Sequence, residues 1–385
     1  MKVIVLGAGM YVTGREDSGN GTVLASLIQL SKKIKIEKIA IIARKKGNKI
    51  VVDKAASKIK QLLGNNVIVE YQSIKEGTSL AKYCKREKFT CGIVVTPDHT
   101  HFKLIKILLE LQIHVLCAKP LVNTLNENIE LIKLQQKNKV LGFVEFHKRY
   151  DEANLYTKKI VRDGAIGDVL YYTVDYSQRI SIPQETFHAW VDKTNIFQYL
   201  GVHYVDLFYF ITDFKPIRLM SYGTRGKLAR DGIDTYDSVH SSIIWKNKNE
   251  KECITTFNTN WIDPNSTSAL SDQKYKLIGT NGRIENNHKD RGIELVSDKQ
   301  AIQHPNPYFS EFLPNPNSDF DFHGYGYKSI KQFINDVLMF NQGKISQKLL
   351  DDNRPSFKQA LVSTAILENV NKSLNNNANW YEINV

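Results

Sequence analysis

The sequence predicts an α/β protein with two domains, an N-terminal doubly wound parallel sheet and a C-terminal α+β domain with an open, mainly antiparallel sheet. Two observations predict this fold class. In residues 1–122, short apolar runs typical of buried strands alternate with segments of helical period, which indicates right-handed β-α-β crossovers. In residues 123–385, several runs alternate apolar and polar side chains, which indicates an antiparallel sheet with one open face.

Composition and charge narrow the class of partner. No apolar run approaches the roughly 18–20 residues that a membrane span needs. The formal net charge is +12, but the lysines are scattered, and no aromatic–basic module for reading nucleic acid is visible. We therefore expect no membrane and no nucleic-acid partner. The positive charge suits an anionic small molecule.

The N-terminus and the cysteines bear on location and on metal binding. Residues 2–6 are apolar but too short for the core of a signal peptide, so we expect a cytoplasmic protein. The cysteines show no C-x-x-C pair and no metal-ligand spacing, so we expect free thiols and no metal site. The four are Cys84, Cys91, Cys117 and Cys253.

A glycine pair follows the first expected strand, residues 2–6. Gly7-Ala8-Gly9 would let the backbone turn tightly and approach a pyrophosphate, as in dinucleotide-binding Rossmann domains. Val12 stands where G-x-G-x-x-G has its third glycine, and the next amphipathic helix begins only near residue 22. We therefore expect a long phosphate loop or one short turn before the helix. The cofactor-binding candidates here are Gly7, Gly9, Met10 and Tyr11.

The second expected strand, residues 36–43, ends in three cations, Arg44-Lys45-Lys46. Domains that bind NAD usually place an acidic residue here for the ribose 2′-hydroxyl. Cations in its place suit a 2′-phosphate, so we favour NADP as the cofactor, with Arg44 as its ligand, and NAD stays possible. The alternative is that these are solvated turn residues of a lysine-rich protein.

Two later strand ends carry polar side chains. Residues 92–96 form a buried strand that runs into Thr96-Pro97-Asp98-His99-Thr100-His101. The strand at residues 113–116 runs into Cys117-Ala118-Lys119-Pro120-Leu121. A lysine past the carboxyl end of a buried strand lies where α/β sheets bind ligands, and the proline stiffens its turn. The alternative is an ordinary surface lysine.

The second half offers fewer chemical groups. Lys148 and Arg149 follow the expected strand at residues 140–146 and are candidates for binding anionic substrate groups, or else belong to a solvated linker. In the helical segment 195–211, Tyr199, His203 and Asp206 are four and three positions apart and so share a face. A histidine can accept and return a hydroxyl proton near neutral pH, although on an apolar helix it is often a core residue.

Together these motifs resemble the glucose–fructose oxidoreductase / inositol dehydrogenase / MocA family over most of the chain. The resemblance rests on Gly7-Ala8-Gly9, residues 95–101 and 114–121, and two later segments, 163–168 and 201–206. The family's usual Glu-Lys-Pro is Ala118-Lys119-Pro120 here, and Tyr199 replaces the aspartate that precedes the family histidine, which His203 matches.

The resemblance implies hydride transfer between a nicotinamide and a carbon of a sugar or cyclitol, with Lys119 near the reacting hydroxyl and His203 as acid/base. Residues 1–122 would bind the dinucleotide, and residues 123–385 would bind the substrate and form a dimer or tetramer through the sheet. The implied catalytic residues are Lys119, His203 and Tyr199. Further cofactor ligands would be Thr96, Pro97, His99, His101 and Lys119. Substrate ligands would be Lys148, Arg149, Asp206 and His203.

We therefore expect a cytoplasmic NAD(P)-dependent dehydrogenase or reductase that acts on CH–OH groups of a sugar or sugar derivative, with an anionic or nucleotide-linked sugar as one option. The alternative is a dinucleotide-binding sensor or regulatory protein without catalytic activity. Ala118 and Tyr199 are the features that favour this alternative.

Overall fold

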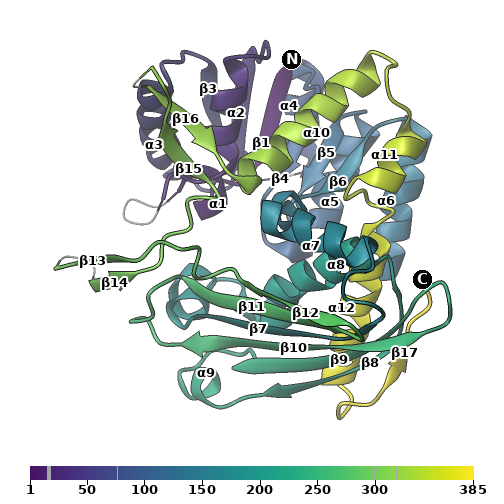
Figure 1. The fold of residues 1–385 in the computed structure, drawn as a ribbon. Helices are drawn as coiled ribbons and strands as arrows, with labels where there is room; N and C mark the ends of the chain where they lie inside the picture. Colours follow the sequence, from purple (N-terminus) through teal and green to yellow (C-terminus); the bar gives the residue numbers. More distant parts are fainter. Residues whose placement is uncertain (15–18, 76, 299–300, 318) are drawn as a thin grey trace. The chain divides into compact units, whose positions relative to one another are not determined.

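The computed structural model describes residues 1–385 except 15–18, 76, 299–300 and 318. Contacts divide the chain into two units, each formed by separate stretches of sequence (Figure 1). The first unit comprises Met1–Val122, Asn126–Asp151 and Pro307–Ala360. The second comprises Asn123–Leu125, Glu152–Asn306 and Leu361–Val385. This division differs from a single boundary after residue 122, because one later stretch adds a strand to the first sheet and another packs on that unit.

The first unit is built on a six-stranded, wholly parallel sheet with strand order β3-β2-β1-β4-β5-β6. This confirms the expected doubly wound sheet. Its strands are β1 (Lys2–Leu6), β2 (Lys38–Ala43), β3 (Ile68–Ser73), β4 (Cys91–Val94), β5 (His114–Cys117) and β6 (Gly142–Val144). Its main helices are α2 (Val23–Ser31), α3 (Asn48–Leu63), α4 (Gly77–Glu87), α5 (His101–Glu110) and α6 (Leu125–Asn138).

Both faces of this sheet are covered, as a parallel sheet requires. Alternate residues of β1 enter two different cores: Val3 and Val5 pack with residues of α2 and α3, and Ile4 packs with residues of α4, α5 and α6. All three of these β1 side chains are fully buried. The near-continuous apolar strand follows from burial on both sides.

Residues far along the chain return to the first unit. Helix α10 (Tyr325–Asn341) packs on α2, and Phe333 and Ile334 join the core that contains Val3. The remaining elements of this return are β15 (Glu311–Pro314), β16 (Phe320–His323) and α11 (Gln347–Asn353) (Figure 1). The first unit is therefore completed by a helix that begins 181 residues after its last strand, since β6 ends at Val144 and α10 begins at Tyr325.

The second unit is built on a seven-stranded sheet with order β12-β11-β7-β10-β9-β8-β17. Every neighbouring pair is antiparallel except β7 and β10, which confirms the expected mainly antiparallel sheet. The strands are β7 (Val169–Arg179), β8 (Lys215–Thr224), β9 (Ser238–Lys246), β10 (Glu252–Asp263), β11 (Ser271–Gly279), β12 (Gly282–Asn287) and β17 (Tyr381–Glu382). A separate hairpin joins β13 (Leu295–Ser297) and β14 (Ala301–Gln303).

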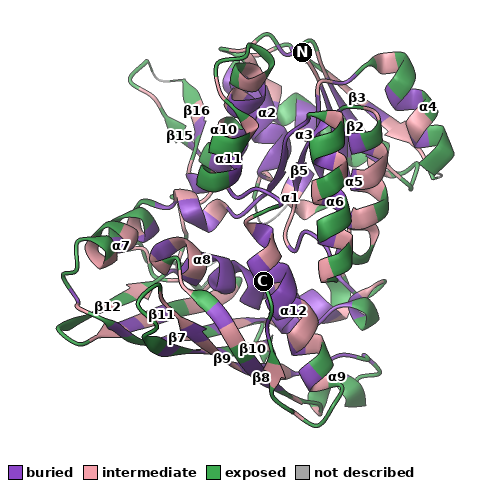
Figure 2. Ribbon diagram, turned by 90° about the vertical axis from the view of Figure 1, so that its right-hand side faces the viewer, coloured by how far each residue is buried: buried purple, intermediate pink, exposed green. Residues whose placement is uncertain are grey.

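One face of the second sheet carries the core of this unit. In β10, Cys253, Phe257 and Trp261 are buried, whereas Ile254 and Asn258 on the other face are exposed. The buried face packs against α8 (Val202–Thr212) and α12 (Ala360–Leu374), and apolar side chains from the sheet and both helices form one large cluster. Figure 2 shows α8 mostly in the colour of buried residues. Helix α7 (Glu152–Arg162) packs on α8.

Two smaller observations complete the fold. In the described part of the chain, no helix has the length and apolar character needed to cross a membrane. All four cysteines are buried and free.

Candidate cofactor and active site

The turn after β1 requires glycine at position 7 for steric reasons. Its φ is +117°, and a Cβ there would lie 1.9 Å from the carbonyl oxygen of Val95. Its N–H donates to the carbonyl of Ile42 at 2.8 Å. The backbone therefore passes so close to the end of β4 that no side chain fits at this position.

Gly9, in contrast, lies on an open part of the turn. A Cβ at Gly9 would meet nothing within 4 Å, so the surface beside this turn is open and the missing side chain leaves the backbone accessible. The short helix α1 (Met10–Thr13) follows, and α2 starts only at Val23. The expected short turn before the helix is thus present, although residues 15–18 of the polar loop lie outside the described part. The open backbone fits a pyrophosphate.

The cations at the end of β2 form a defined surface feature. Arg44, Lys45 and Lys46 line an open pocket of about 420 Å³ together with Lys75, which follows β3. The turn is held by its neighbours on β3: the hydroxyl of Ser73 donates to the carbonyl of Arg44 at 3.0 Å, and that of Tyr71 donates to the carbonyl of Lys45 at 2.5 Å. Lys75 was not foreseen from the sequence, because only the pairing of β2 with β3 brings it to Arg44.

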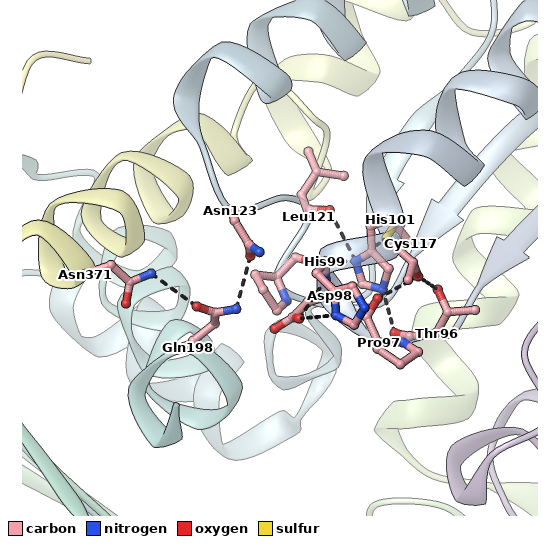
Figure 3. A network of polar contacts seen from close by, with 12 residues as sticks. Thr96, Pro97, Asp98, His99, His101, Cys117, Leu121, Asn123, Gln198 and Asn371 are labelled. Carbon is pink, nitrogen blue, oxygen red and sulfur yellow. Dashed lines mark hydrogen bonds and ion pairs between the residues drawn. The ribbon is translucent and has the colours of Figure 1, made fainter. Parts of the chain in front are cut away.

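His101 was expected to contact the cofactor, but in this structure its ring contacts backbone carbonyls of two turns. The ring is buried, and Nε2 lies 2.8 Å from the carbonyl oxygen of Thr96. Nδ1 lies 2.8 Å from the carbonyl oxygen of Pro120 and 3.2 Å from that of Leu121 (Figure 3). His101 thus links the turn after β4 to the turn that carries Lys119, so its contacts in the structure hold these two turns together.

The other residues of the β4 turn are nearer to the surface. The Thr96 hydroxyl lies 2.7 Å from the Thr100 hydroxyl, which also donates to the carbonyl of Pro97 at 2.7 Å. The backbone N–H of His99 donates to a carboxylate oxygen of Asp98 at 2.7 Å, and His99 itself is exposed. The turn is therefore rigid, and its exposed side remains open to a ligand.

Lys119 has a strongly altered proton affinity. Desolvation by burial lowers the pKa of its ammonium to about 7, and Lys148 adds to this lowering, whereas the carboxylates of Asp98 and Glu145 oppose it. The three flanking charges come from the turns after β4 and β6, on either side of β5. At neutral pH the ammonium and the amine are therefore present in comparable amounts, which suits acid/base chemistry.

Lys148 and Arg149 are both buried, in a short 3₁₀ turn at His147–Tyr150. Lys148 lies close enough to Lys119 to affect its pKa, which places it in the same group of charges. Arg149 donates a hydrogen bond to the side-chain oxygen of Gln359, and its guanidinium lies 5.9 Å from the centre of the Phe146 ring. Of the two predicted substrate ligands, the structure thus brings Lys148 toward the lysine turn and ties Arg149 to the return segment.

The remaining residues predicted for catalysis and substrate binding belong to the second unit. His203 and Asp206 are buried on α8, and Tyr199 lies in the π-helical turn Phe197–Gly201 that precedes it. The Tyr199 ring packs 4.6 Å from that of Phe187 and 6.2 Å from that of Trp261, between ring centres. The three residues are therefore carried by one continuous segment, with Tyr199 half-buried in an aromatic cluster.

A chain of amide side chains fixes this segment. Asn195 donates to Asn371 at 2.9 Å. Asn371 donates to Gln198 at 3.2 Å, and Gln198 donates to Asn123 at 3.1 Å (Figure 3). The side chain of Asn195 also accepts from the backbone N–H of Gln198 at 2.9 Å. These residues could not be predicted from the sequence, because amides spread from Asn123 to Asn371 give no local pattern.

The fold and the glycine turn define an NAD-binding α/β oxidoreductase scaffold, and comparison with known families agrees. Residues 2–146 match the family model described as oxidoreductase family, NAD-binding Rossmann fold, and residues 155–285 match the GFO/IDH/MocA C-terminal domain. The chain belongs to the Gfo/Idh/MocA oxidoreductase family.

Individual relatives are similar over shorter stretches. Levoglucosan dehydrogenase of Pseudarthrobacter phenanthrenivorans is 28% identical over 97 residues, which are 25% of this chain and 25% of that protein. The scyllo-inositol 2-dehydrogenase (NADP(+)) of Bacillus subtilis is 28% identical over 118 residues, 30% of this chain and 32% of that protein. The matched segments thus span a quarter to a third of these relatives.

Solved structures match over nearly the whole chain. GenD2 from gentamicin A biosynthesis, in complex with NAD, has a TM-score of 0.72 at 16% identity and covers 100% of this chain and 97% of its own. Myo-inositol 2-dehydrogenase from Lactobacillus plantarum has a TM-score of 0.69 at 18% identity, with 100% and 99% covered. At these identities the likeness establishes the fold.

Proposed function

We propose that this chain is an NAD(P)-dependent oxidoreductase that transfers hydride between a nicotinamide and a hydroxyl or keto carbon of a sugar or sugar derivative. The observation that carries the proposal is Lys119. It lies just past β5 in an NAD-binding sheet, and its pKa is lowered to about 7 by burial. A lysine with this pKa at the ligand-binding edge of the sheet is matched to proton transfer at a reacting hydroxyl.

The residues present fit a dinucleotide. The backbone at Gly9 is open, and the pocket of Arg44, Lys45, Lys46 and Lys75 offers positive charge where a ribose 2′-phosphate would require it. We therefore propose NADP as the preferred cofactor. When bound, the nicotinamide ring supplies the hydride donor or acceptor, and the protein supplies orientation and charge. The scyllo-inositol dehydrogenase noted above carries NADP(+) in its name, which agrees with this preference.

The chain's own residues would divide the remaining work. Lys119 as an ammonium donates a hydrogen bond to the reacting oxygen and polarises it. His203 accepts the hydroxyl proton during oxidation and returns it during reduction. Tyr199 supplies a second hydroxyl to this relay, and Asp206 orients the imidazole. Lys148 binds an anionic group of the substrate, and Arg149 supports it through the turn they share.

The proposed substrate is a polyhydroxylated small molecule. The names of several relatives refer to levoglucosan, inositols and a sialic acid derivative, all rich in hydroxyl groups. The net charge of +12 and the buried Lys148 favour a substrate with a carboxylate, a phosphate or a nucleotide diphosphate. The open face of the second sheet, with Ile254 and Ile262 exposed, is the proposed surface for a dimer or tetramer.

The test begins with cofactor binding. We expect NADPH to bind with enhanced fluorescence and NADH to bind more weakly. A panel of sugars, sugar acids, cyclitols and nucleotide sugars is then screened for change in absorbance of the reduced cofactor. Binding of NADH alone would contradict the NADP preference. Binding without turnover on any member of the panel, together with a stable protein partner, would favour the sensor to which Ala118 and Tyr199 point.

A further inference from the structure

Glu145 stands beside the lysine turn although it is distant from it in sequence. It directly follows β6, and its backbone N–H donates to the carbonyl of Cys117 at 2.7 Å. Val144 pairs with Cys117 in the parallel register of β5 and β6. Glu145 is therefore the neighbour, on the adjacent strand end, of Ala118, the residue immediately before Lys119.

The carboxylate of Glu145 is buried and only half satisfied. Its side chain is 5% exposed. One oxygen, Oε2, accepts from Nδ1–H of His147 at 2.8 Å. The other, Oε1, is buried and has no partner in good hydrogen-bonding geometry among the described residues, although the Tyr11 hydroxyl is close enough for this carboxylate to raise its pKa. A buried carboxylate in this state requires a nearby positive charge to offset the cost of its desolvation.

Aromatic rings pack around the His147 ring, which is the hydrogen-bond partner of this carboxylate. The ring of His147 lies 5.6 Å from that of Tyr325 and 5.1 Å from that of Phe309, and the Tyr11 ring lies 6.3 Å from those of His147 and Phe309. Burial raises the pKa of the Tyr11 hydroxyl, and the charge of Glu145 raises it further. In such surroundings a charge acts strongly on its neighbours.

Charged groups on two neighbouring turns act on Lys119. Asp98 approaches it from the turn after β4, and Glu145 and Lys148 approach it from the turn after β6. Asp98 already accepts a hydrogen bond from the backbone N–H of His99 at 2.7 Å, whereas Glu145 keeps an oxygen with no partner in good hydrogen-bonding geometry among the described residues. Both carboxylates favour the ammonium of Lys119, Asp98 more strongly than Glu145, and Glu145 is the one that lies at the end of the neighbouring strand β6.

We propose that Glu145 is a positioning residue for Lys119: from the end of β6 it supplies the buried carboxylate that favours and orients the ammonium form of this lysine. It thereby takes the place of a carboxylate at position 118, where this chain has alanine. The catalytic consequence rests on the proposed function. The effect of Glu145 on the charge of Lys119 does not, and it can be measured without cofactor or substrate.

The experiment measures the rate at which acetic anhydride acylates Lys119 in the full chain, as a function of pH, by mass spectrometry of the peptide that contains it. Only the amine reacts, so the midpoint of the profile reports the proton affinity of Lys119. Glu145→Gln should lower the midpoint by roughly 1 pH unit, as expected for loss of a close opposite charge. Glu145→Asp, which keeps the charge, should stay close to wild type. Glu130→Gln, an exposed carboxylate on α6, is the matched control.

Two outcomes overturn the proposal. One is a Glu145→Gln midpoint equal to wild type. The other is an equal shift in Glu145→Asp, which would show that shape and not charge is responsible. His147→Phe keeps the carboxylate of Glu145 and an aromatic ring but removes the hydrogen-bond donor, so the midpoint should not fall. This variant is used if Glu145→Gln does not fold, and a lower midpoint in His147→Phe would likewise overturn the proposal.

A second readout links the charge to catalysis. If a substrate is found, the alkaline limb of kcat/KM, where the ammonium of Lys119 is lost, should move to lower pH in Glu145→Gln by the same roughly 1 unit. Activity relative to wild type should then recover as the pH is lowered. Absence of any turnover would count against the proposed function, whereas the acylation profile would still decide the role of Glu145.

Discussion

The carboxyl edge of the first sheet holds two groups of cations that differ in burial. Arg44, Lys45, Lys46 and Lys75 are exposed around an open pocket at the ends of β2 and β3. Lys119 lies past β5, partly buried between carboxylates and Lys148, and its pKa is lowered to about 7. The same sheet edge therefore offers one site for fixed positive charge and one for a cation that can lose its proton.

The difference shows how burial decides the use of a charge. An exposed cation interacts with an anion through solvent, so its contribution is modest, additive and screened by salt. Desolvation raises the free energy of a charged lysine, so small changes in its surroundings change the fraction that is protonated. The first group is suited to binding an anionic cofactor, and Lys119 is suited to chemistry. Substitutions in the first group should therefore change cofactor affinity, and substitution of Lys119 should change the catalytic rate.

The largest expected effect is that of Lys119→Met. Because the ammonium is proposed to polarise the reacting oxygen, kcat/KM should fall by about 10³-fold, within the range typical of acid/base groups, while the Kd for NADPH changes little. Steady-state kinetics and cofactor titration check this. Lys103→Met, an exposed lysine on α5, is the control and should behave as wild type. Activity of Lys119→Met near that of wild type would remove Lys119 from the mechanism.

His203→Gln should have the next largest effect. The glutamine keeps a polar side chain on α8 but cannot accept and return a proton, so kcat should fall by about 10²-fold with a smaller change in KM. The pH profile distinguishes this role from a structural one, because a limb present in wild type should be absent in the variant. A lower rate with an unchanged pH profile would indicate that His203 serves packing.

Arg44→Ser tests the exposed group. Loss of a charged contact to a 2′-phosphate should weaken NADPH binding by roughly 10-fold and leave NADH binding nearly unchanged. The difference between the two cofactors should shrink as salt concentration rises, because exposed charges are screened. Lys58→Ser, an exposed lysine on α3, is the matched control. Equal weakening of both cofactors would show that Arg44 does not distinguish them.

The smallest expected effect is on stability. The folded pKa of Lys119, about 7, lies below the ordinary lysine value of 10.5, so the unfolded chain binds the additional proton between these values. The charged lysine therefore opposes folding fully below pH 7, and this cost disappears as the pH rises toward 10.5. Lys119→Met should raise the Tm by about 1–3 °C at pH 6, and by less at pH 10. Calorimetry at both pH values measures it, and a lower Tm at pH 6 would contradict it.

Much of the first unit could be predicted because its evidence is local. Residues 2–6 and 36–43 are apolar because their strands are buried on both faces, and Gly7 is visible because the turn tolerates no other residue. The second unit was harder. Strand β8 was not predicted, since Pro216 near its start and the irregular register between Pro216 and Arg218 break its alternation.

The sequence by itself determined the two sheets, the family and the lysine turn, because strand period, glycine spacing and proline act over a few neighbouring residues. Only the tertiary structure decided that residues 307–360 complete the first unit, that Lys75 joins Arg44, and that Glu145 lies at the strand end beside the lysine turn. These relations depend on which strands pair and which segments share a core. Charge and burial act through space, so positions distant in the chain set the proton affinity of the lysine that the sequence had already marked.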